Sequence, residues 1–315
     1  MSGRLRAAME FRQLRYFVSI ADLGSVSRAS RALHIAQPAL SQQLAQLEAE
    51  LGHALLLRRS SGVVLTDHGR EFYRHAQRIL KQLAQVPAAL DASAGEPAGD
   101  VAIGLPQSTA AQYAMPLLAA LAGRHPRIRL ELFDEISGNL LAGLDSGRLD
   151  LAVLVGDEDA ALAQAVPLLE EELYLISRAG AAPRGRSVRV AALARLPLTL
   201  PGAGQGVRGL VEQVVRAQGQ ELPRPRVVAN SMSIMRQAMR DGIAHSVMPW
   251  GAVADDLQAG TLVAQPLSPR LKRRAWLAVA RDAEGSAAME AVAQVLGDVV
   301  RERIAAGAWP GSTLP

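Results

Sequence analysis

The stretch IAQPALSQQLAQLE, residues 35–48, decides the fold of the N-terminal third of the chain. Its leucines and the next one, at position 51, recur at spacings of four, three and four residues, the apolar stripe of an α-helix. Pro38 precedes this stripe. Proline is tolerated at the first helical position because the N–H that it lacks would have no intrahelical partner there. The spacing therefore predicts a helix that begins at Pro38, with Gln37 at the cap position.

The edge of this helix opposite the leucines is short, uncharged and rich in hydrogen-bond donors and acceptors. Glutamine can pair with adenine through two hydrogen bonds, serine with several bases, and a small apolar side chain can contact a thymine methyl group. The edge therefore favours contacts to bases in the DNA major groove over the alternative, a small three-helix bundle with a neutral face. Its members are Gln37, Pro38, Ala39, Ser41 and Gln42.

Two shorter helices are expected before this one. Gly24 ends the first, and Ser25 can cap the second, over SVSRASRAL. Two short helices joined by a tight linker, the second with a polar N-terminal turn, form a helix-turn-helix, so Ser25 joins the candidate DNA-binding residues. The apolar face of the first helix consists of Leu14, Phe17, Val18 and Ala21.

A β-hairpin is expected next, because LLLRR and VVLT are apolar runs on either side of a turn at Ser60, Ser61 and Gly62. A hairpin beside a helix-turn-helix is a wing. Arg58 and Arg59 on this wing could reach phosphates or a minor groove, or they could be solvated strand charges.

Thr66 is then expected to cap a long helix, which Pro87 should kink or end near its distal end. The apolar residues of this helix follow a heptad pattern, and an isolated helix cannot bury such a seam. Packing against a second copy would form a dimer; the alternative is packing against the chain's own body. The candidate dimerisation residues are Phe72, Ala76, Ile79, Leu83 and Val86.

Residues 10–70 resemble the DNA-binding head of the LysR-type transcriptional regulators. The motifs that carry this resemblance are FRQLRYFVSIADLGSVSRASRAL, AQPALSQQLAQLEAELG and LLLRRSSGVVLTDHG, and HIAQPALSQQ is most similar to the nitrogen assimilation control subgroup. The resemblance implies that the polar edge lies in the major groove, that the wing approaches the minor groove and that the long helix dimerises. Relatives often carry basic residues at the wing tip, where this chain has Ser60 and Ser61, so minor-groove contact depends on Arg58 and Arg59.

Composition and charge narrow the class of protein. The chain has 315 residues, enough for two or three domains, and it contains no cysteine, which excludes disulfides and thiolate metal sites. Residues 1–92 carry 12 Lys or Arg and 7 Asp or Glu, a balance of +5, whereas the remainder has a balance of −1. This asymmetry suggests a polyanion-binding head on a near-neutral body, although a basic surface without a partner would look the same. We find neither a signal peptide nor a transmembrane segment, so we expect a cytoplasmic protein without membrane contact.

Beyond residue 92, strands and helices alternate, which predicts a mostly parallel sheet with helices on both faces. The expected fold class is therefore α+β multidomain, ending in an α/β two-subdomain effector domain; the family resemblance implies a fold like the periplasmic binding proteins. The expected boundaries are 9–66 for the winged helix-turn-helix, 67–91 for the linker helix, 92–99 for a hinge, 100–304 for the effector domain and 305–315 for a disordered tail. Within the effector domain, subdomain I covers about 100–168 and 268–304, and subdomain II about 169–267.

A small-molecule effector is expected between the two subdomains, at loops that follow strands and open helices. The candidate effector-binding residues are Ser108, Thr109, Ser137, Gly138, Gly204, Asn230 and Ser231. Each of them alone is more typical of a helix cap than of a ligand contact. The charge runs DEDA, LEEEL and KRR at 272–274 are expected to be solvated.

One motif supports a rival function. Gly204, Gly206 and Gly209 form G-x-G-x-x-G between a strand and a helix, the dinucleotide fingerprint of nicotinamide enzymes. That fingerprint requires an acidic residue about 20 positions on, where this chain has Asn230. We therefore expect no enzyme activity, cofactor or metal. The expected function is that of a LysR-type regulator, which binds double-stranded DNA and a small-molecule effector as a dimer or tetramer. RNA polymerase is a possible further partner. The closest alternative is a regulator that does not respond to an effector.

Overall fold

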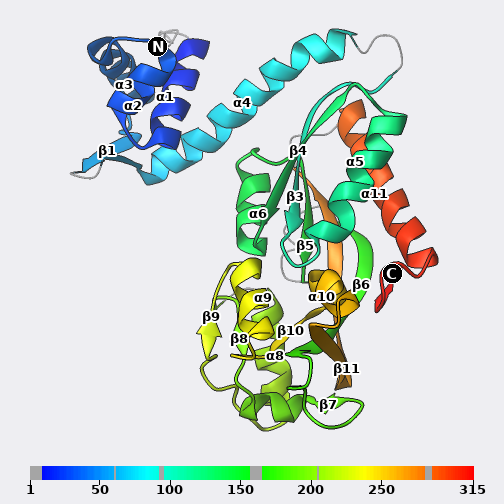
Figure 1. Ribbon diagram of the computed structural model, residues 1–315. Helices are drawn as coiled ribbons and strands as arrows, with labels where there is room; N and C mark the ends of the chain where they lie inside the picture. Colours follow the sequence, from blue (N-terminus) through cyan, green and yellow to red (C-terminus); the bar gives the residue numbers. More distant parts are fainter. Residues whose placement is uncertain (1–8, 60–61, 92–95, 157–164, 204–205, 281–285) are drawn as a thin grey trace. The chain divides into compact units, whose positions relative to one another are not determined.

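The computed structural model describes residues 9–59, 62–91, 96–156, 165–203, 206–280 and 286–315 (Figure 1). The chain divides into two compact units, Met1–Ser93 with Asp145–Arg148, here called the head, and Ala94–Leu144 with Leu149–Pro315, here called the body. Some of the predictions concern residues outside the described ranges. These are the wing tip at Ser60 and Ser61, part of the hinge at 92–95, the DEDA run and Gly204.

The first two helices of the head are those expected from its caps. Helix α1 spans Phe11–Leu23 and ends at Gly24, whose φ of 60° lies in the left-handed region that glycine adopts without strain. Helix α2 spans Val26–Leu33, and the Ser25 hydroxyl accepts a hydrogen bond of 3.3 Å from the Arg28 amide. Both the stop at Gly24 and the cap at Ser25 are confirmed.

Helix α3 spans Gln37–Leu51 and begins one residue earlier than predicted. Its N-cap is Ala36, so Gln37 is the first helical residue rather than the cap, and Pro38 is the second. The shift costs no hydrogen bond, because none of the first four N–H groups of a helix has an intrahelical partner. The predicted stripe is confirmed, since Leu40, Leu44 and Leu47 are buried in the head.

The wing is a two-stranded hairpin of β1, Leu56–Arg59, and β2, Gly62–Leu65. Leu56 pairs with Leu65 and Arg59 with Gly62, which confirms the predicted hairpin. The Val63 amide donates a hydrogen bond of 3.0 Å to the Gly24 carbonyl. This bond attaches the wing to the turn between α1 and α2.

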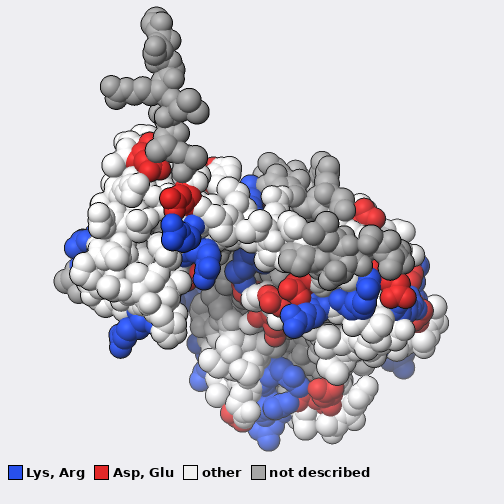
Figure 2. Space-filling model, turned by 90° about the horizontal axis from the view of Figure 1, so that it is seen from above, with Lys and Arg blue, Asp and Glu red and all other residues white. Residues whose placement is uncertain are grey.

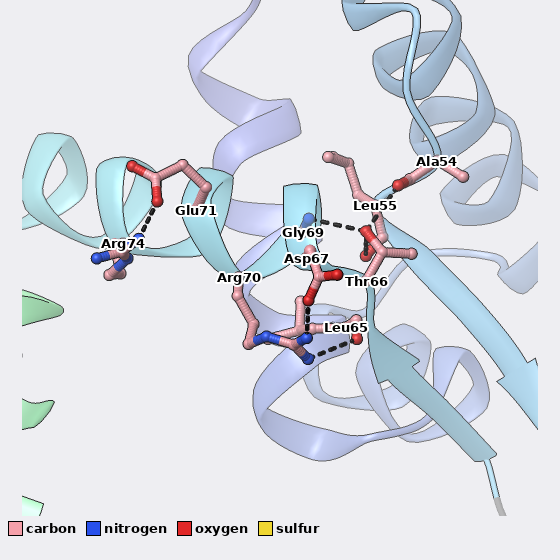
Figure 3. A network of polar contacts seen from close by, with 9 residues as sticks. All are labelled: Ala54, Leu55, Leu65, Thr66, Asp67, Gly69, Arg70, Glu71 and Arg74. Carbon is pink, nitrogen blue, oxygen red and sulfur yellow. Dashed lines mark hydrogen bonds and ion pairs between the residues drawn. The ribbon is translucent and has the colours of Figure 1, made fainter.

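Helix α4 spans Asp67–Asp91, and the preceding residue, Thr66, caps its N-terminus. Figure 3 shows the Thr66 hydroxyl at the junction between the wing and the helix. This hydroxyl donates to the Ala54 carbonyl at 2.7 Å, and its oxygen accepts from the Gly69 amide at 2.8 Å, so the predicted cap is confirmed. The helix does not end at Pro87 but continues to Asp91.

Replacing Thr66 by Ala should lower the free energy of unfolding of the head by about 1–2 kcal/mol, since it removes the cap and leaves the Gly69 amide unpaired. Urea unfolding followed by circular dichroism measures this loss. Thr66→Ser keeps the hydroxyl and should recover most of it. Equal stability of the Ala and Ser variants would show that the cap contributes nothing.

The first part of the predicted seam on α4 packs against the head, which corrects one of the dimerisation residues, Ala76. Ala76 has no exposed surface, and Phe72 lies against Phe17 with ring centroids 5.0 Å apart. Ala76 therefore belongs to the core of its own head, and the half-buried Phe72 packs against that core. The residues of the seam beyond them, Ile79, Leu83 and Val86, remain exposed.

The body is built on one mixed sheet whose strands follow the order β10-β6-β11-β5-β3-β4. Along this order, β3 pairs in parallel with its neighbours β4 and β5, whereas the two long strands β6 and β11 run antiparallel to each other, and β10 and β5 run antiparallel to them. The expectation of a mostly parallel sheet was therefore wrong, because β6 and β11 pass through both subdomains and join them. The strands are β3 Gly99–Pro106, β4 Ile128–Glu135, β5 Leu151–Val155, β6 Val166–Arg178, β10 Ser246–Pro249 and β11 Leu262–Val279.

Helices cover both faces of this sheet, as expected (Figure 1). In β3, Val101, Ile103 and Leu105 pack against α5, Ala110–Arg124, and α11, Ala287–Ala305. Ala102 belongs to the core on the opposite face, with α6, Ser137–Asp145. A Cβ at Gly104 would lie 2.4 Å from Leu140, so this glycine lets α6 approach the sheet.

The second subdomain surrounds the distal parts of β6 and β11 with short elements. Its cores contain Leu173, Leu175 and Val247 on one side, and Ile176, Met235 and Met248 on the other. The elements are β7 Val188–Arg189, η2 Val190–Arg195, β8 Thr199–Leu200, α8 Gly206–Ala217, β9 Val227–Val228, α9 Met232–Arg240, η3 Trp250–Val253 and α10 Ala254–Gln258.

The C-terminal tail is ordered, contrary to expectation. Strand β12, Ser312–Thr313, pairs with Glu170 and Glu171 of β6. Trp309 is 2% exposed and packs edge-on against Tyr113 of α5 at 4.9 Å between ring centroids. Burial of this one large aromatic side chain explains the order in a segment otherwise rich in glycine and alanine. Of the helices in the described ranges, none is long and apolar enough to cross a membrane.

Candidate functional site

The polar edge of α3 forms two neighbouring rows on the surface of the head. Gln37 and Ser41 are one helical turn apart, and so are Pro38 and Gln42. Ser41 is half-buried, and the other members of the edge, with Ala39, are exposed. The side chains that could contact bases are therefore presented together over the first turn and a half of the helix.

A residue that the sequence did not single out positions Gln37. The Ser27 hydroxyl, on the first turn of α2, donates a hydrogen bond of 3.0 Å to the Gln37 side-chain oxygen Oε1. The Gln37 amide nitrogen then keeps both of its N–H groups for another acceptor. The signal that could have revealed Ser27 is its place at the start of the helix that precedes the polar edge.

Part of the free positive charge of the head lies beside this edge and on the wing. The side chains of Arg28, Arg58 and Arg59 form no hydrogen bond or ion pair with any of the described residues. Other arginines are paired locally, as Arg70 is with Asp67 and Arg74 with Glu71 (Figure 3). On the face shown in Figure 2, basic and acidic groups of the described residues lie beside one another.

The distal part of α4 carries an exposed apolar row. Ile79, Leu83 and Val86 are 41%, 51% and 46% exposed, and they continue the heptad spacing. Exposure of three large aliphatic side chains on one stripe of a helix is typical of a protein–protein contact.

The body contains a cleft with about 600 Å³ of space, part of which is open to solvent. Its walls come from the ends of β3 and β4 and from the loops around α8, α9 and β10. The lining is predominantly apolar with a few polar groups, as in most small-molecule sites. It consists of Pro106, Gln107, Ser108, Glu135, Ile136, Val155, Pro201, Gly206, Val207, Ala229, Asn230, Met232, Met235, Val247, Met248 and Arg273.

Two of the predicted effector-binding residues, Ser108 and Asn230, line this cleft. Asn230 also accepts a hydrogen bond of 2.7 Å from the Gly202 amide through its side chain. Ser231 instead caps α9, and its hydroxyl accepts from the Ile234 amide.

The other predicted effector-binding residues do not join the cleft lining. Thr109 is 1% exposed and is the N-cap residue of α5. Gly138 is exposed but is not part of the lining, to which the nearby Glu135 and Ile136 belong. The Ser137 side chain lies outside the described part of the chain, as Gly204 does.

Arg273 is the main functional candidate that the sequence did not predict. Residues 170–172 of β6 stand opposite residues 272–274 of β11, so the LEEEL and KRR runs form a cross-strand ladder of opposite charges. The central pair is buried: the Arg273 and Glu171 side chains are 4% and 1% exposed, with Nη2 2.7 Å from Oε2. The runs are therefore not simply solvated, and their central arginine reaches the cleft.

The glycine motif has a structural role in the described residues. Gly206 is the first residue of α8. Arg208 binds Glu212 through Nε at 2.7 Å and the Pro201 carbonyl through Nη1 at 3.2 Å, so it is engaged within its own subdomain. The described residues contain no group of three or more acidic or histidine side chains that could hold a metal ion.

Comparison with known proteins agrees with this division of the chain. The "LysR substrate binding domain" family matches residues 94–301, and the "Bacterial regulatory helix-turn-helix protein, lysR family" matches residues 11–70. The nitrogen assimilation regulatory protein nac of Escherichia coli (strain K12) is 36% identical over 247 residues, 78% of this chain and 79% of that protein. The regulator BbuR of Bordetella bronchiseptica is 31% identical over 305 residues, 95% and 92% of the two chains.

Solved structures show the same fold. A full-length OxyR variant from Pseudomonas aeruginosa matches with a TM-score of 0.69 and 24% identity, over 94% of this chain and 95% of that one. Full-length CbnR complexed with its target DNA matches with a TM-score of 0.63 and 23% identity, over 93% and 99%. The chain therefore belongs to the LysR family of transcriptional regulators, with a DNA-binding helix-turn-helix head and an effector-binding body.

Proposed function

We propose that the polar edge of α3 enters the DNA major groove and distinguishes base sequences through Gln37, Ser41 and Gln42. The observation that carries this proposal is the Ser27–Gln37 hydrogen bond, which orients an exposed amide before DNA is present. Such a preorganised amide suits the two-bond pairing of glutamine with adenine. Pro38 and Ala39 add small apolar surface for a thymine methyl group.

The wing supplies sequence-independent affinity in this proposal. Arg58 and Arg59 are exposed and have no acidic partner among the described residues, so phosphates can pair with them without breaking an existing ion pair. Arg28, near the turn to which the wing is attached, adds a third such charge.

Self-association in this proposal uses the row Ile79, Leu83 and Val86, which buries its apolar surface against the same row of a second copy. Two heads joined in this way would read two half-sites of one operator. Higher assembly to a tetramer and contact with RNA polymerase fit a regulator of this family and extend the same proposal.

The body is proposed to bind a small molecule in the cleft and to change how well the heads fit DNA. This requires an effector with different affinities for two states of the protein. We also infer that the protein works in the cytoplasm and catalyses no reaction, in line with relatives that are transcriptional regulators. A regulator without effector response is the alternative, and it predicts that no compound bound in the cleft changes operator affinity.

Replacing Gln37 by Ala should weaken operator binding by roughly 1–3 kcal/mol and leave binding to unrelated DNA unchanged, because one base contact is lost. Arg58→Ala should weaken both equally and reduce the salt dependence by about one phosphate contact. Fluorescence anisotropy at several salt concentrations, with a duplex selected from a random pool by the parent protein, measures both effects.

Gln46→Ala is the matched control. Gln46 lies on the same helix, more than two turns beyond Gln37, and its amide already bonds Glu50. This variant should bind the selected duplex as the parent does. Equal losses for Gln37→Ala on selected and unrelated duplexes would contradict base reading at that position.

A further inference from the structure

We propose that the ligand of the cleft is a small monocarboxylate with an apolar body, and that Arg273 and Ser108 hold its carboxylate. This inference rests on the effector role proposed for the cleft and adds the chemical class of the effector. It begins from Arg273, a cation that is more than nine-tenths buried and that also lines the cleft.

The hydrogen bonds of Arg273 leave one side of its guanidinium group unused. Nε and Nη2 both donate to Oε2 of Glu171, at 2.9 and 2.7 Å. Nη2 also donates to the Ser108 hydroxyl at 2.8 Å. Nη1 makes no hydrogen bond with the residues that the structure describes. Arginine has five N–H donors, so a further acceptor can bind at Nη1 without displacing Glu171.

Ser108 adds donors at the same place. Its hydroxyl oxygen accepts from Arg273, so its own hydrogen is available for a ligand. Its backbone amide donates to none of the described residues. Helix α5 begins two residues later, and the positive end of its dipole favours a negative charge at this loop. Guanidinium, hydroxyl and amide donors close together suit a carboxylate, which accepts several hydrogen bonds and donates none.

The rest of the cleft decides which carboxylates fit. Met232, Met235 and Met248 line it with Val207 and Val247, a surface that adapts to aliphatic or aromatic ligands. Glu135 is the other charged residue among the described lining, and it would repel a second negative charge. The lining therefore favours a monocarboxylate over a dicarboxylate, with the carbon chain against the methionines.

Glu171 neutralises the charge of Arg273 when no ligand is bound in the cleft. Without Glu171, burial of the charged Arg273 guanidinium group would destabilise the fold. If acceptors instead occupied both edges of the guanidinium group, no N–H group would be left for a ligand. Here Glu171 engages through one oxygen only. The pair is thus stable before binding and still offers Nη1 to a ligand.

Isothermal titration of the full-length protein with hexanoate, hexanamide and adipate tests this inference. Hexanoate should bind at least about tenfold more tightly than hexanamide, which lacks the charge, and than adipate, whose second carboxylate meets Glu135 or the methionines. In the double variant Arg273→Met/Glu171→Gln, which removes both buried charges together, hexanoate and hexanamide should bind equally. Lys272→Met removes an exposed positive charge next to Arg273 and should retain the tenfold preference.

Three results would overturn the inference. These are equal binding of hexanoate and hexanamide to the parent, a preference for hexanoate that survives in the double variant, and failure of hexanoate to bind. The first of these would still leave a ligand-binding cleft, so the proposed effector role would stand without the carboxylate. Binding of the head to operator DNA is measured in a separate experiment. That experiment tests the regulator proposal, so its failure can be told apart from failure of the carboxylate proposal.

Discussion

Replacing Leu83 by Glu should convert the protein to a monomer and lower its affinity for a two-fold symmetric operator roughly 100-fold or more. Leu83 is the central residue of the exposed row on α4, between Ile79 and Val86. A carboxylate there would face its copy across the two-fold axis, where charges of the same sign meet in apolar surroundings. Each head would then bind a half-site alone and lose the gain from a tethered second head. Analytical ultracentrifugation measures assembly, and anisotropy with the selected duplex measures affinity.

Ala84→Glu is the control for this variant. It adds the same charge at the next residue, which is exposed and lies off the heptad row. This control should remain associated and bind DNA as the parent does. If the Leu83→Glu protein sediments like the parent, the exposed row is not the interface between copies.

Replacing Arg273 by Met should lower the free energy of unfolding of the body by about 3–5 kcal/mol, because it leaves Glu171 charged and unpaired at 1% exposure. Adding Glu171→Gln should recover most of this loss, since no buried charge then remains. All three tryptophans, Trp250, Trp276 and Trp309, lie in the body, so tryptophan fluorescence during urea unfolding reports on it alone. A loss below 1 kcal/mol in the single variant would show that the pair is not as isolated from water as its burial indicates.

The head could be predicted closely from the sequence because its signals are local. Leucine spacing set the phase of α3, and Gly24, Ser25 and Thr66 marked helix ends through hydrogen bonds to residues within a few positions. Pro38 was misplaced by one residue, because any position in the first helical turn tolerates a missing N–H. Ala76 was assigned to the wrong contact, because a heptad pattern does not distinguish a neighbouring helix of the same chain from a second copy.

The body was predicted less well because its main features depend on residues far apart in the chain. Strands β6 and β11 contain runs of charge that break the apolar alternation, so their antiparallel pairing was missed. Glu171 and Arg273 are 102 positions apart and neutralise each other only in the folded sheet. Of the cleft residues, only those at loops that open helices, such as Ser108, carried a local signal.

The central claim is that the polar edge of α3 reads DNA sequence, and selection from a random duplex pool tests it most directly. The full-length parent should enrich an inverted repeat. The double variant Gln37→Ala/Ser41→Ala should enrich duplexes with a sequence preference at fewer positions, at least one fewer in each half-site. Both proteins should retain similar affinity for unrelated DNA, because the wing arginines are unchanged. Recovery of the same motif by parent and double variant, or enrichment of no motif by the parent, would contradict the account.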